Sequence, residues 1–198
     1  MNPTMRRIWL TVLLAPLALT GCGYNSIQQY DEQAQAAKQQ IEVQLQRRAD
    51  LIPNLVQTVK GYAAQEEAIF VKVAEARAGL IGAVKGGDAS QMADANQNLT
   101  GALGRLLAIS EAYPQLKSDQ SFLRLQDELS GTENRIAVSR TDYNGAVRTY
   151  NTYIRTFPQV LTAKVTGAKE RPYFETTSAA AKEVPSVDFG KSPAKKAP

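Results

Sequence analysis

The segment that decides the fold is residues 52–80, IPNLVQTVKGYAAQEEAIFVKVAEARAGL. Its stripe positions recur in alternating steps of three and four residues through four heptads, which is the spacing of a helix face that packs in a bundle. These positions are Ile52, Leu55, Val59, Tyr62, Glu66, Ile69, Val73, Ala76 and Leu80. The pattern predicts one long helix with a single charged residue, Glu66, in its seam.

Three further segments carry the same helical periodicity. They are residues 24–49, 88–113 and 118–157. Gly86 and Gly87 are expected to end one helix before Asp88 caps the next, and Pro114 ends the third segment because the residue before a proline avoids helical dihedrals. Short connections make neighbouring helices antiparallel. The expected fold is therefore all-α, a long antiparallel up-down four-helix bundle over residues 22–158 with an extended C-terminal tail.

The connection between the first two helices is expected at Asp50-Leu51-Ile52-Pro53. Asp50 can cap a new helix, and Pro53 is tolerated in a first turn because its missing N–H would have no helical partner there. These residues predict a sharp turn. A kinked but continuous helix is the alternative.

The N-terminus has the pattern of a secretion signal. Residues 8–19 form an apolar run, IWLTVLLAPLAL, directly after Arg6-Arg7. The run is shorter than the about 20 residues that a transmembrane helix needs, and it has the length of a signal-peptide core. Small residues then precede the only cysteine of the chain, so that four residues resemble a bacterial lipobox. They are Leu19, Thr20, Gly21 and Cys22.

This pattern predicts cleavage of residues 1–21 and lipidation of Cys22, whose acyl chains would anchor the protein in a membrane. Gly23, rather than Asp, follows the cysteine. By the sorting rule for lipoproteins, that indicates the periplasmic face of the outer membrane in a host with two membranes. The alternative is an uncleaved signal that stays as a membrane span.

The composition excludes several kinds of catalytic site. The chain of 198 residues has no histidine and one cysteine, which removes Ser/His/Asp and Cys/His nucleophile pairs and His-ligated zinc, copper and haem. No cofactor is expected, and no metal site, because the carboxylates are too sparse for a dimetal site without histidine. No dense Lys/Arg stripe interleaves with aromatic residues, so no nucleic-acid partner is expected.

Polar residues inside the predicted helices are the candidate interaction residues. A buried carboxylate is costly unless it is paired, so Glu66 predicts an arginine partner that sets helix register; a general acid or an anion site is the alternative. Asparagine is a poor helix former, and its positions predict bundle-interior or capping contacts, or a groove for a partner helix or the chain's own tail. The set is Arg47, Arg48, Asn54, Glu66, Arg77, Asn144 and Asn151.

The helical pattern ends at Phe157-Pro158. Short apolar clusters at residues 171–175 and 184–189 lie in a stretch rich in Pro, Ser, Thr and Ala. They predict that residues 159–190 form an extended tail docked on the bundle. Residues 191–198 hold three lysines and nothing to bury, and they are expected to be a disordered basic C-terminus.

Several strings of the sequence resemble the signature of the LemA family. The first is QRRADLIPNLV, residues 46–56, followed by Val59-Lys60-Gly61-Tyr62, Glu66 and Glu75-Ala76-Arg77. Later strings are Tyr143-Asn144, Tyr150-Asn151, Phe157-Pro158, and residues 172–175 and 187–189. The resemblance covers residues 24–189. It implies a membrane-tethered helical bundle on the outer side of the cytoplasmic membrane, in a family without an established biochemical activity. The resemblance also implies an uncleaved N-terminal span, from which the lipobox departs.

Two classes of function follow. The first is a non-enzymatic scaffold or adaptor, anchored by its N-terminus in the bacterial cell envelope and binding a membrane-associated protein partner. It needs only a surface and an anchor, and the sequence supplies both. The second is an enzyme or ligand-binding protein with a site among bundle-interior Glu, Arg and Asn residues. A pocket in which Glu66 and arginines converge would favour the second class, and the first is the prediction.

Overall fold

The computed structural model of the chain describes residues 3–176, with side chains from residue 23 onward. The side chains of the lipobox, including Cys22, and the whole of residues 184–189 and 191–198 lie outside the described part. All regular structure within residues 3–176 is helical. The all-α class predicted from the sequence is confirmed.

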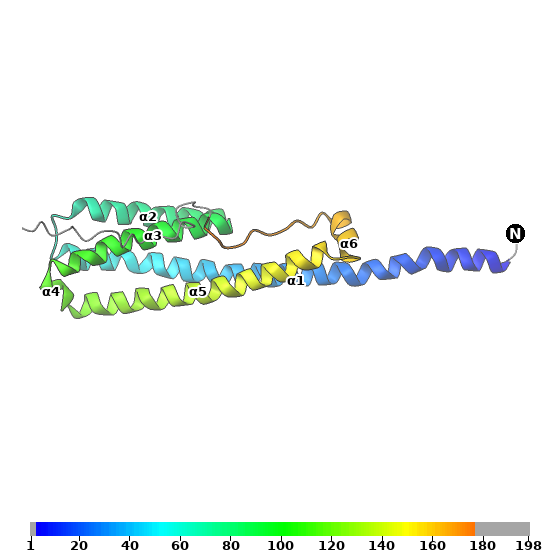
Figure 1. Ribbon diagram of the computed structural model, residues 1–198, viewed down its shortest axis with the longest axis horizontal. Helices are drawn as coiled ribbons and strands as arrows, with labels where there is room; N and C mark the ends of the chain where they lie inside the picture. The colour runs from blue at the N-terminus through cyan, green and yellow to red at the C-terminus, as the bar shows by residue number, and fades with distance from the viewer. Residues whose placement is uncertain (1–2, 177–198) are drawn as a thin grey trace, which may run out of the picture.

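Two long antiparallel helices form the spine of the molecule, α1 (Pro3–Lys60) and α5 (Gln120–Arg155). They pack against each other more extensively than any other pair of elements (Figure 1). The stripe that α1 buries repeats every three or four residues, as a helix with one apolar face requires. Its members are Ile27, Ala34, Ile41, Leu45, Ile52, Leu55 and Val59. Asp119 begins α5, because its side chain accepts a hydrogen bond of 2.9 Å from the Phe122 amide.

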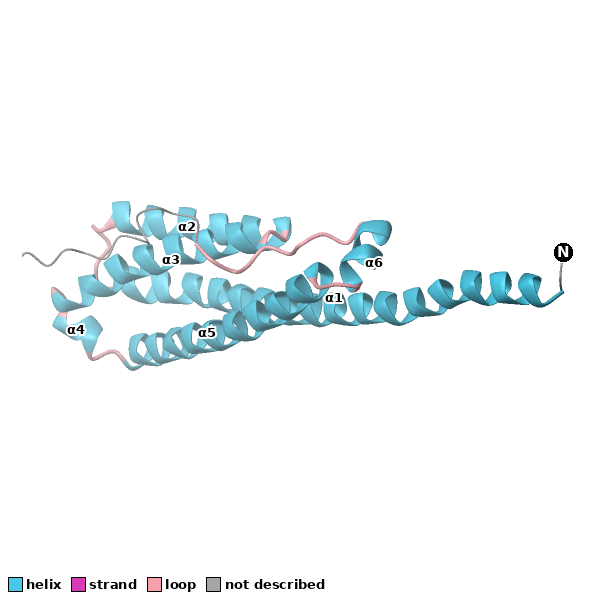
Figure 2. Cartoon of the chain, turned by 45° about the vertical axis from the view of Figure 1, so that its right-hand side comes forward, coloured by secondary structure: helices cyan, strands magenta, loops and turns pink. Residues whose placement is uncertain are grey.

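The next two helices, α2 (Glu67–Gly86) and α3 (Ala89–Ala108), form a hairpin along one part of this pair (Figure 2). Gly87 ends α2 in the left-handed region, at φ 72°, where a residue without Cβ is favoured. Asp88 caps α3 by accepting a hydrogen bond of 2.8 Å from the Gln91 amide. Both boundaries lie where the sequence predicts them. A 3₁₀ turn, η1 (Ile109–Glu111), and α4 (Pro114–Lys117) lead into α5.

The helices are unequal in length, so four long helices do not run together along the whole molecule. Helices α2 and α3 have 20 residues each, against 36 in α5. Beyond the hairpin, α6 (Gln159–Thr166) and the extended chain after it flank α1 and α5 instead (Figure 1). Helix α6 lies in a segment expected to be extended. It forms because Pro158 and the left-handed Gly167 delimit a short helix whose Ala163 is buried with Ile27 and Ile154.

The predicted turn at residues 50–53 is wrong, and the continuous helix is correct: α1 passes through Pro53 and ends at Lys60. The chain instead turns between Lys60 and Glu67. Two local signals mark this turn, the low helix propensity of Gly61 and the acidic pair Glu66-Glu67, which the helix dipole favours at an N-terminus. The heptad pattern conceals the turn because α1 and α2 direct their apolar faces at the same core.

Hydrogen bonds tie this turn to the connection between α3 and α5. The Tyr62 hydroxyl donates to Asp119 Oδ2 at 2.8 Å, and the Gln65 amide bonds to the Tyr113 hydroxyl. Hydrogen bonds from the Phe122 amide and from Tyr62 hold the pKa of Asp119 below its ordinary value. Both helix connections at this end of the molecule are therefore fixed to each other.

Candidate functional site

Two asparagines of α5 each grip one backbone unit of the extended chain that follows α6. Asn151 is 3% exposed; its Nδ2 donates to the Arg171 carbonyl at 2.9 Å, and its Oδ1 accepts from the Arg171 amide at 2.9 Å. Asn144 makes the same two hydrogen bonds with Phe174: its Oδ1 accepts from the Phe174 amide at 2.8 Å, and its Nδ2 donates to the Phe174 carbonyl at 3.4 Å. A carboxamide offers one donor side and one acceptor side, as the edge of a β-strand does. We call residues 171–176 the docked segment.

The spacing of the two asparagines matches that of an extended chain. Asn144 and Asn151 are seven residues apart, about 10.5 Å along a helix, while Arg171 and Phe174 are three residues apart, about 10 Å in an extended chain. The docked segment runs antiparallel to α5, because the later tail residue meets the earlier asparagine. The pair of asparagines therefore recognises an extended backbone by its repeat distance.

The Arg171 side chain ties the docked segment to α1. Its Nε and Nη2 donate to the two carboxylate oxygens of Asp31, at 2.7 and 2.9 Å, and its Nη1 donates to Gln35 Oε1 at 3.1 Å. The guanidinium also lies 6.0 Å from the centre of the Tyr150 ring. The hydrogen bond from Arg171 lowers the pKa of Asp31 below its ordinary value, against the opposing effect of burial. The carboxylate therefore stays ionised beside the guanidinium.

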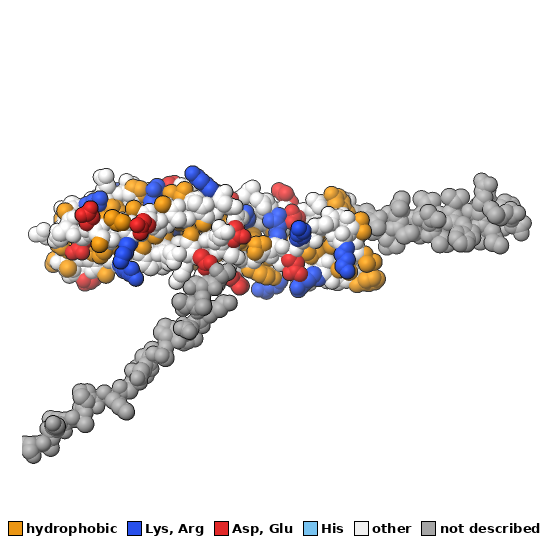
Figure 3. Space-filling model, turned by 90° about the horizontal axis from the view of Figure 1, so that it is seen from above, with side chains coloured by type: hydrophobic (Ala, Val, Ile, Leu, Met, Phe, Trp, Pro, Cys, Tyr) orange, Lys and Arg blue, Asp and Glu red, His pale blue; other side chains and the backbone are white. Residues whose placement is uncertain are grey.

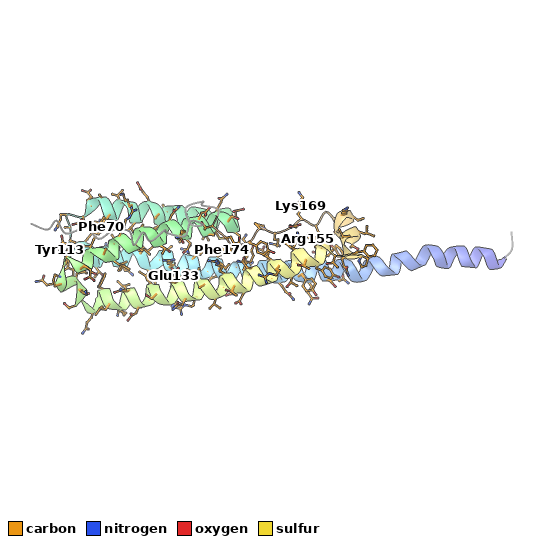
Figure 4. The ribbon with its side chains drawn as sticks, viewed as in Figure 1. Phe70, Tyr113, Glu133, Arg155, Lys169 and Phe174 are labelled. Atoms are coloured by element: carbon orange, nitrogen blue, oxygen red, sulfur yellow. The ribbon has the colours of Figure 1, made fainter. Side chains whose placement is uncertain are left out.

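Two aromatic contacts also hold the docked segment, one made by Tyr143 of α5 and one by its own Phe174. The Tyr143 hydroxyl donates to the Pro172 carbonyl at 2.7 Å, and burial raises the pKa of that hydroxyl. Phe174, labelled in Figure 4, is buried in the main core. The side chains of Arg171, Tyr173, Phe174 and Thr176 thus all contact the rest of the chain, Thr176 through a hydrogen bond to Asp94, and Pro172 is held through its carbonyl.

A second polar cluster, centred on Arg48, joins three helices inside the bundle. Arg48 of α1 is 4% exposed; its Nη1 donates to Asn96 Oδ1 at 2.7 Å and its Nη2 donates to Thr100 Oγ1 at 3.1 Å, both on α3. It also forms an ion pair with Glu133 of α5, whose side chain is 47% exposed. Burial lowers the pKa of Arg48, and the charge of Glu133 opposes that change. This contact sets the register of α1, α3 and α5.

The remaining predicted residues lie apart from these clusters. Arg77 of α2 donates its Nε hydrogen bond to the Ala49 carbonyl of α1 at 2.8 Å. Arg47 and Asn54 are exposed on α1. Glu66 is half-buried at the start of α2, and it makes no side-chain capping hydrogen bond. The prediction that Glu66 sits in a buried seam is wrong, because the chain turns just before it.

The sequence indicates several of the polar residues in these clusters but not the residues that they contact. Asp31, Gln35 and Arg171 carry no periodic signal, because they meet across 136 to 140 residues of chain. Asn96 and Thr100, which bond Arg48, lie one helical turn apart on α3. One available signal was the seven-residue interval from Tyr143-Asn144 to Tyr150-Asn151, which repeats the same pair on one face of α5.

Among the residues whose side chains the structure describes, no group of carboxylates could hold a metal ion. None of the helices, over the part whose side chains are described, combines the length and the apolar character needed to cross a membrane.

Comparisons with known proteins give the family. The model of the LemA family matches residues 37–189. The chain is 32% identical over 175 residues to magnetosome protein MamQ 2 of Paramagnetospirillum magneticum, and 33% identical over 174 residues to magnetosome protein MamQ of Magnetospirillum gryphiswaldense. The alignments cover 77% and 76% of this chain and 64% of each relative, so the chain spans under two thirds of the length of these proteins. The chain belongs to the LemA family.

Proposed function

We propose that the protein is a non-enzymatic helical scaffold of the bacterial cell envelope, held at a membrane by its N-terminus and binding a membrane-associated protein partner. The anchor is Cys22, lipidated after cleavage of residues 1–21. In a host with two membranes, Gly23 directs the protein to the periplasmic face of the outer membrane. An uncleaved span formed by the same N-terminal residues is the competing anchor.

The observation that carries this proposal is the continuity of α1. Helix α1 runs from Pro3 to Lys60 at the far turn, so the part that cleavage would leave continues without a break from the anchoring residue to that turn, and an uncleaved span would belong to the same helix. The bundle and the anchoring segment therefore belong to one element, which suits a protein that presents a surface beside a membrane.

The relatives support a structural role. Their description, magnetosome protein, names a cell structure and not a reaction. Membership of the LemA family agrees with a membrane tether, which the resemblance of the sequence already implies. A structural role, with no reaction attached, is what we transfer to this chain.

The polar residues that an enzyme site would use are engaged in holding the fold together. Arg48, Asn144 and Asn151 bond to α3 or to the docked segment. Within residues 23–176, no ion pair joins Glu66 to an arginine. The convergent pocket that would favour an enzyme is not formed there, which supports the scaffold over the enzyme or ligand-binding alternative.

The anchor is tested by cell fractionation and mass spectrometry of the N-terminal peptide. For the wild-type chain we expect a membrane-bound protein that begins at Cys22 and carries acyl chains. Cys22→Ala should retain residues 1–21 and carry none, whereas Thr20→Ala, which keeps a small residue before the cysteine, should be processed normally. An unprocessed wild-type chain would overturn the lipid anchor in favour of the span, and a chain absent from the membrane fraction would overturn both.

The partner is tested by crosslinking in cells, followed by purification and mass spectrometry. We expect the wild-type chain and Thr20→Ala to recover the same envelope protein. Cys22→Ala should not recover it, because its bundle is not delivered to the same membrane. Recovery of that protein with all three chains would contradict the need for the anchor, and recovery of soluble proteins alone would contradict the scaffold.

A further inference from the structure

Exposed apolar side chains gather at the α6 end of the molecule. Phe157, Leu161 and Val165 follow one another at intervals of four residues, and their exposed fractions are 76%, 56% and 88%. Leu161 and Val165 share one face of α6, since residues four apart on a helix are neighbours. We call these three residues, with the exposed Tyr24 of α1, the apolar end surface. Orange side chains are visible at this end of the described molecule in Figure 3.

The other face of α6 is packed, so the apolar end surface cannot turn inward. Ala163 is buried in a small cluster with Ile27, Tyr150 and Ile154. Thr162 lies beside α1, where a Cβ built on Gly23 would be 3.3 Å from its Oγ1. Single exposed apolar residues are common on soluble proteins, but a group of them marks a surface that meets another apolar phase or partner.

Basic residues border this surface. Lys164 and Lys169 are exposed, and neither forms an ion pair with another residue of the described chain. Arg155, labelled with Lys169 in Figure 4, ends α5 just before Phe157 and pairs with Glu170 at 3.4 Å, so Lys164 and Lys169 are the border cations without an ion pair in the described chain. Apolar side chains next to lysine and arginine are the composition of helices that lie in the interface of a lipid bilayer, where the cations meet anionic headgroups.

The position of α6 along α1 indicates which apolar phase covers this surface. Gly23 lies against α6, and the apolar run of the N-terminus ends at Leu19, four residues or about 6 Å away along the helix. A lipidated Cys22 would be closer still. Either kind of anchor therefore brings the bilayer surface to within about one helical turn of α6.

We propose that the apolar end surface rests in the interface of the phospholipid bilayer to which the N-terminus is attached, with Phe157, Leu161 and Val165 among the upper acyl chains. Lys164 and Lys169 face the headgroups. The bundle is thereby held at the membrane at two places, the N-terminal anchor and α6. This inference rests on the proposed membrane attachment, and it holds for either anchor.

The test uses single tryptophans in the full chain reconstituted into vesicles. Trp9 is the only tryptophan, so Trp9→Phe gives a silent background, to which Leu161→Trp adds a reporter on α6. Val138→Trp is the matched control, because Val138 is 62% exposed but lies in the middle of α5. The vesicles contain phosphatidylcholine and phosphatidylglycerol, with or without bromine on the upper acyl chains, which quenches tryptophan on contact.

We expect the tryptophan at position 161 to lose at least half of its emission in brominated vesicles and to emit at shorter wavelength, because an interfacial helix sits about 5–10 Å into the boundary of headgroups and acyl chains. The tryptophan at position 138 should emit equally in both kinds of vesicle. Equal emission from position 161 would overturn the inference. That result would mean either a solvent-exposed surface or one that a protein covers in the cell.

Flotation of the same vesicles separates this inference from the proposed function. If the chain floats with the vesicles while the tryptophan at position 161 is not quenched, the α6 contact is contradicted and the membrane attachment stands. If the chain does not float, both proposals are contradicted. Circular dichroism of each variant, expected to match that of the wild type, excludes unfolding as the cause of either result.

Discussion

Arg77 of α2 donates its Nε hydrogen bond, at 2.8 Å, to the carbonyl of Ala49, the acceptor that Pro53 leaves without its helical partner. In an uninterrupted helix the amide of residue 53 would bond that oxygen, but proline has no N–H to donate. A side chain from the neighbouring helix replaces the missing backbone donor. This substitution explains how α1 continues through a proline.

The Arg77 contact predicts an energetic coupling with Pro53. Arg77→Ala should lower the free energy of unfolding by about 1–3 kcal/mol, because it leaves a carbonyl without its partner. In a Pro53→Ala background the loss should be smaller, since the amide of residue 53 then bonds Ala49. A double-mutant cycle by urea unfolding measures the difference. Additive effects would show that Arg77 does not stand in for the missing amide of Pro53. As a control, Arg105→Ala, at an exposed arginine on α3, should change the free energy of unfolding little in either background.

The Arg48 cluster predicts different costs for two adjacent arginines. Arg48→Ala should lower the free energy of unfolding by about 2–4 kcal/mol, because it removes a packed side chain and three polar contacts. Arg48→Met should recover much of the lost stability, since methionine fills the space of the arginine side chain and the half-exposed Glu133 can turn to solvent. Arg47→Ala, on the exposed side of α1, should stay within about 0.5 kcal/mol of the wild type. Equal costs at positions 47 and 48 in chemical unfolding would contradict the cluster.

The grip of Asn151 on the docked segment predicts a change in protease sensitivity. Asn151→Leu keeps the side-chain volume but removes both hydrogen bonds to Arg171, so the segment should detach more often. Chymotrypsin should then cut after Phe174 several-fold faster than in the wild-type chain, as read by mass spectrometry. Asn54→Leu, an exposed asparagine on α1, should leave the cleavage rate unchanged. Unchanged cleavage in Asn151→Leu would mean that Arg171 and Phe174 hold the segment without the asparagine.

The pair of Asp31 and Arg171 predicts an acid-sensitive contribution to stability. Because hydrogen bonding to Arg171 lowers the pKa of Asp31 below its ordinary value, the contribution is complete above that ordinary value and is lost as pH falls through the folded-state pKa. The difference in urea midpoint between the wild type and Asp31→Asn should therefore be constant from neutral pH down to mildly acidic pH, and should shrink in stronger acid. A difference that grew on acidification would show the opposite linkage.

The sequence reveals the polar residues of this fold better than their partners. Asn144 and Asn151 stand out because asparagine is a poor helix former, which indicates a tertiary contact. Their partners come from distant parts of the chain, and no local pattern encodes which segment meets which. The helix class and the caps at Gly87 and Asp88 follow from local chemistry, and there the prediction and the structure agree.

Pro53 shows why the turn was misplaced. Helix-breaking rules assume that the carbonyl four residues before a proline has no other donor, and Arg77 supplies one from another helix. Glu66 was assigned to a buried seam for a related reason: residues 52–80 keep one apolar face through the turn, so periodicity alone cannot separate two helices from one. The helix α6 was missed because it is too short for the pattern to appear.

The uninterrupted course of α1 gives the molecule a fixed height. From Gly23, beside α6, to Lys60 at the far turn the helix has 38 residues, which is roughly 57 Å. With α6 at the bilayer surface, as we propose, and α1 along the membrane normal, the turn that joins Tyr62 to Asp119 stands at that height above the lipid, and no loop in α1 lets the helix shorten. Under that proposal, the length of α1 sets how far from the membrane a partner would bind the far turn.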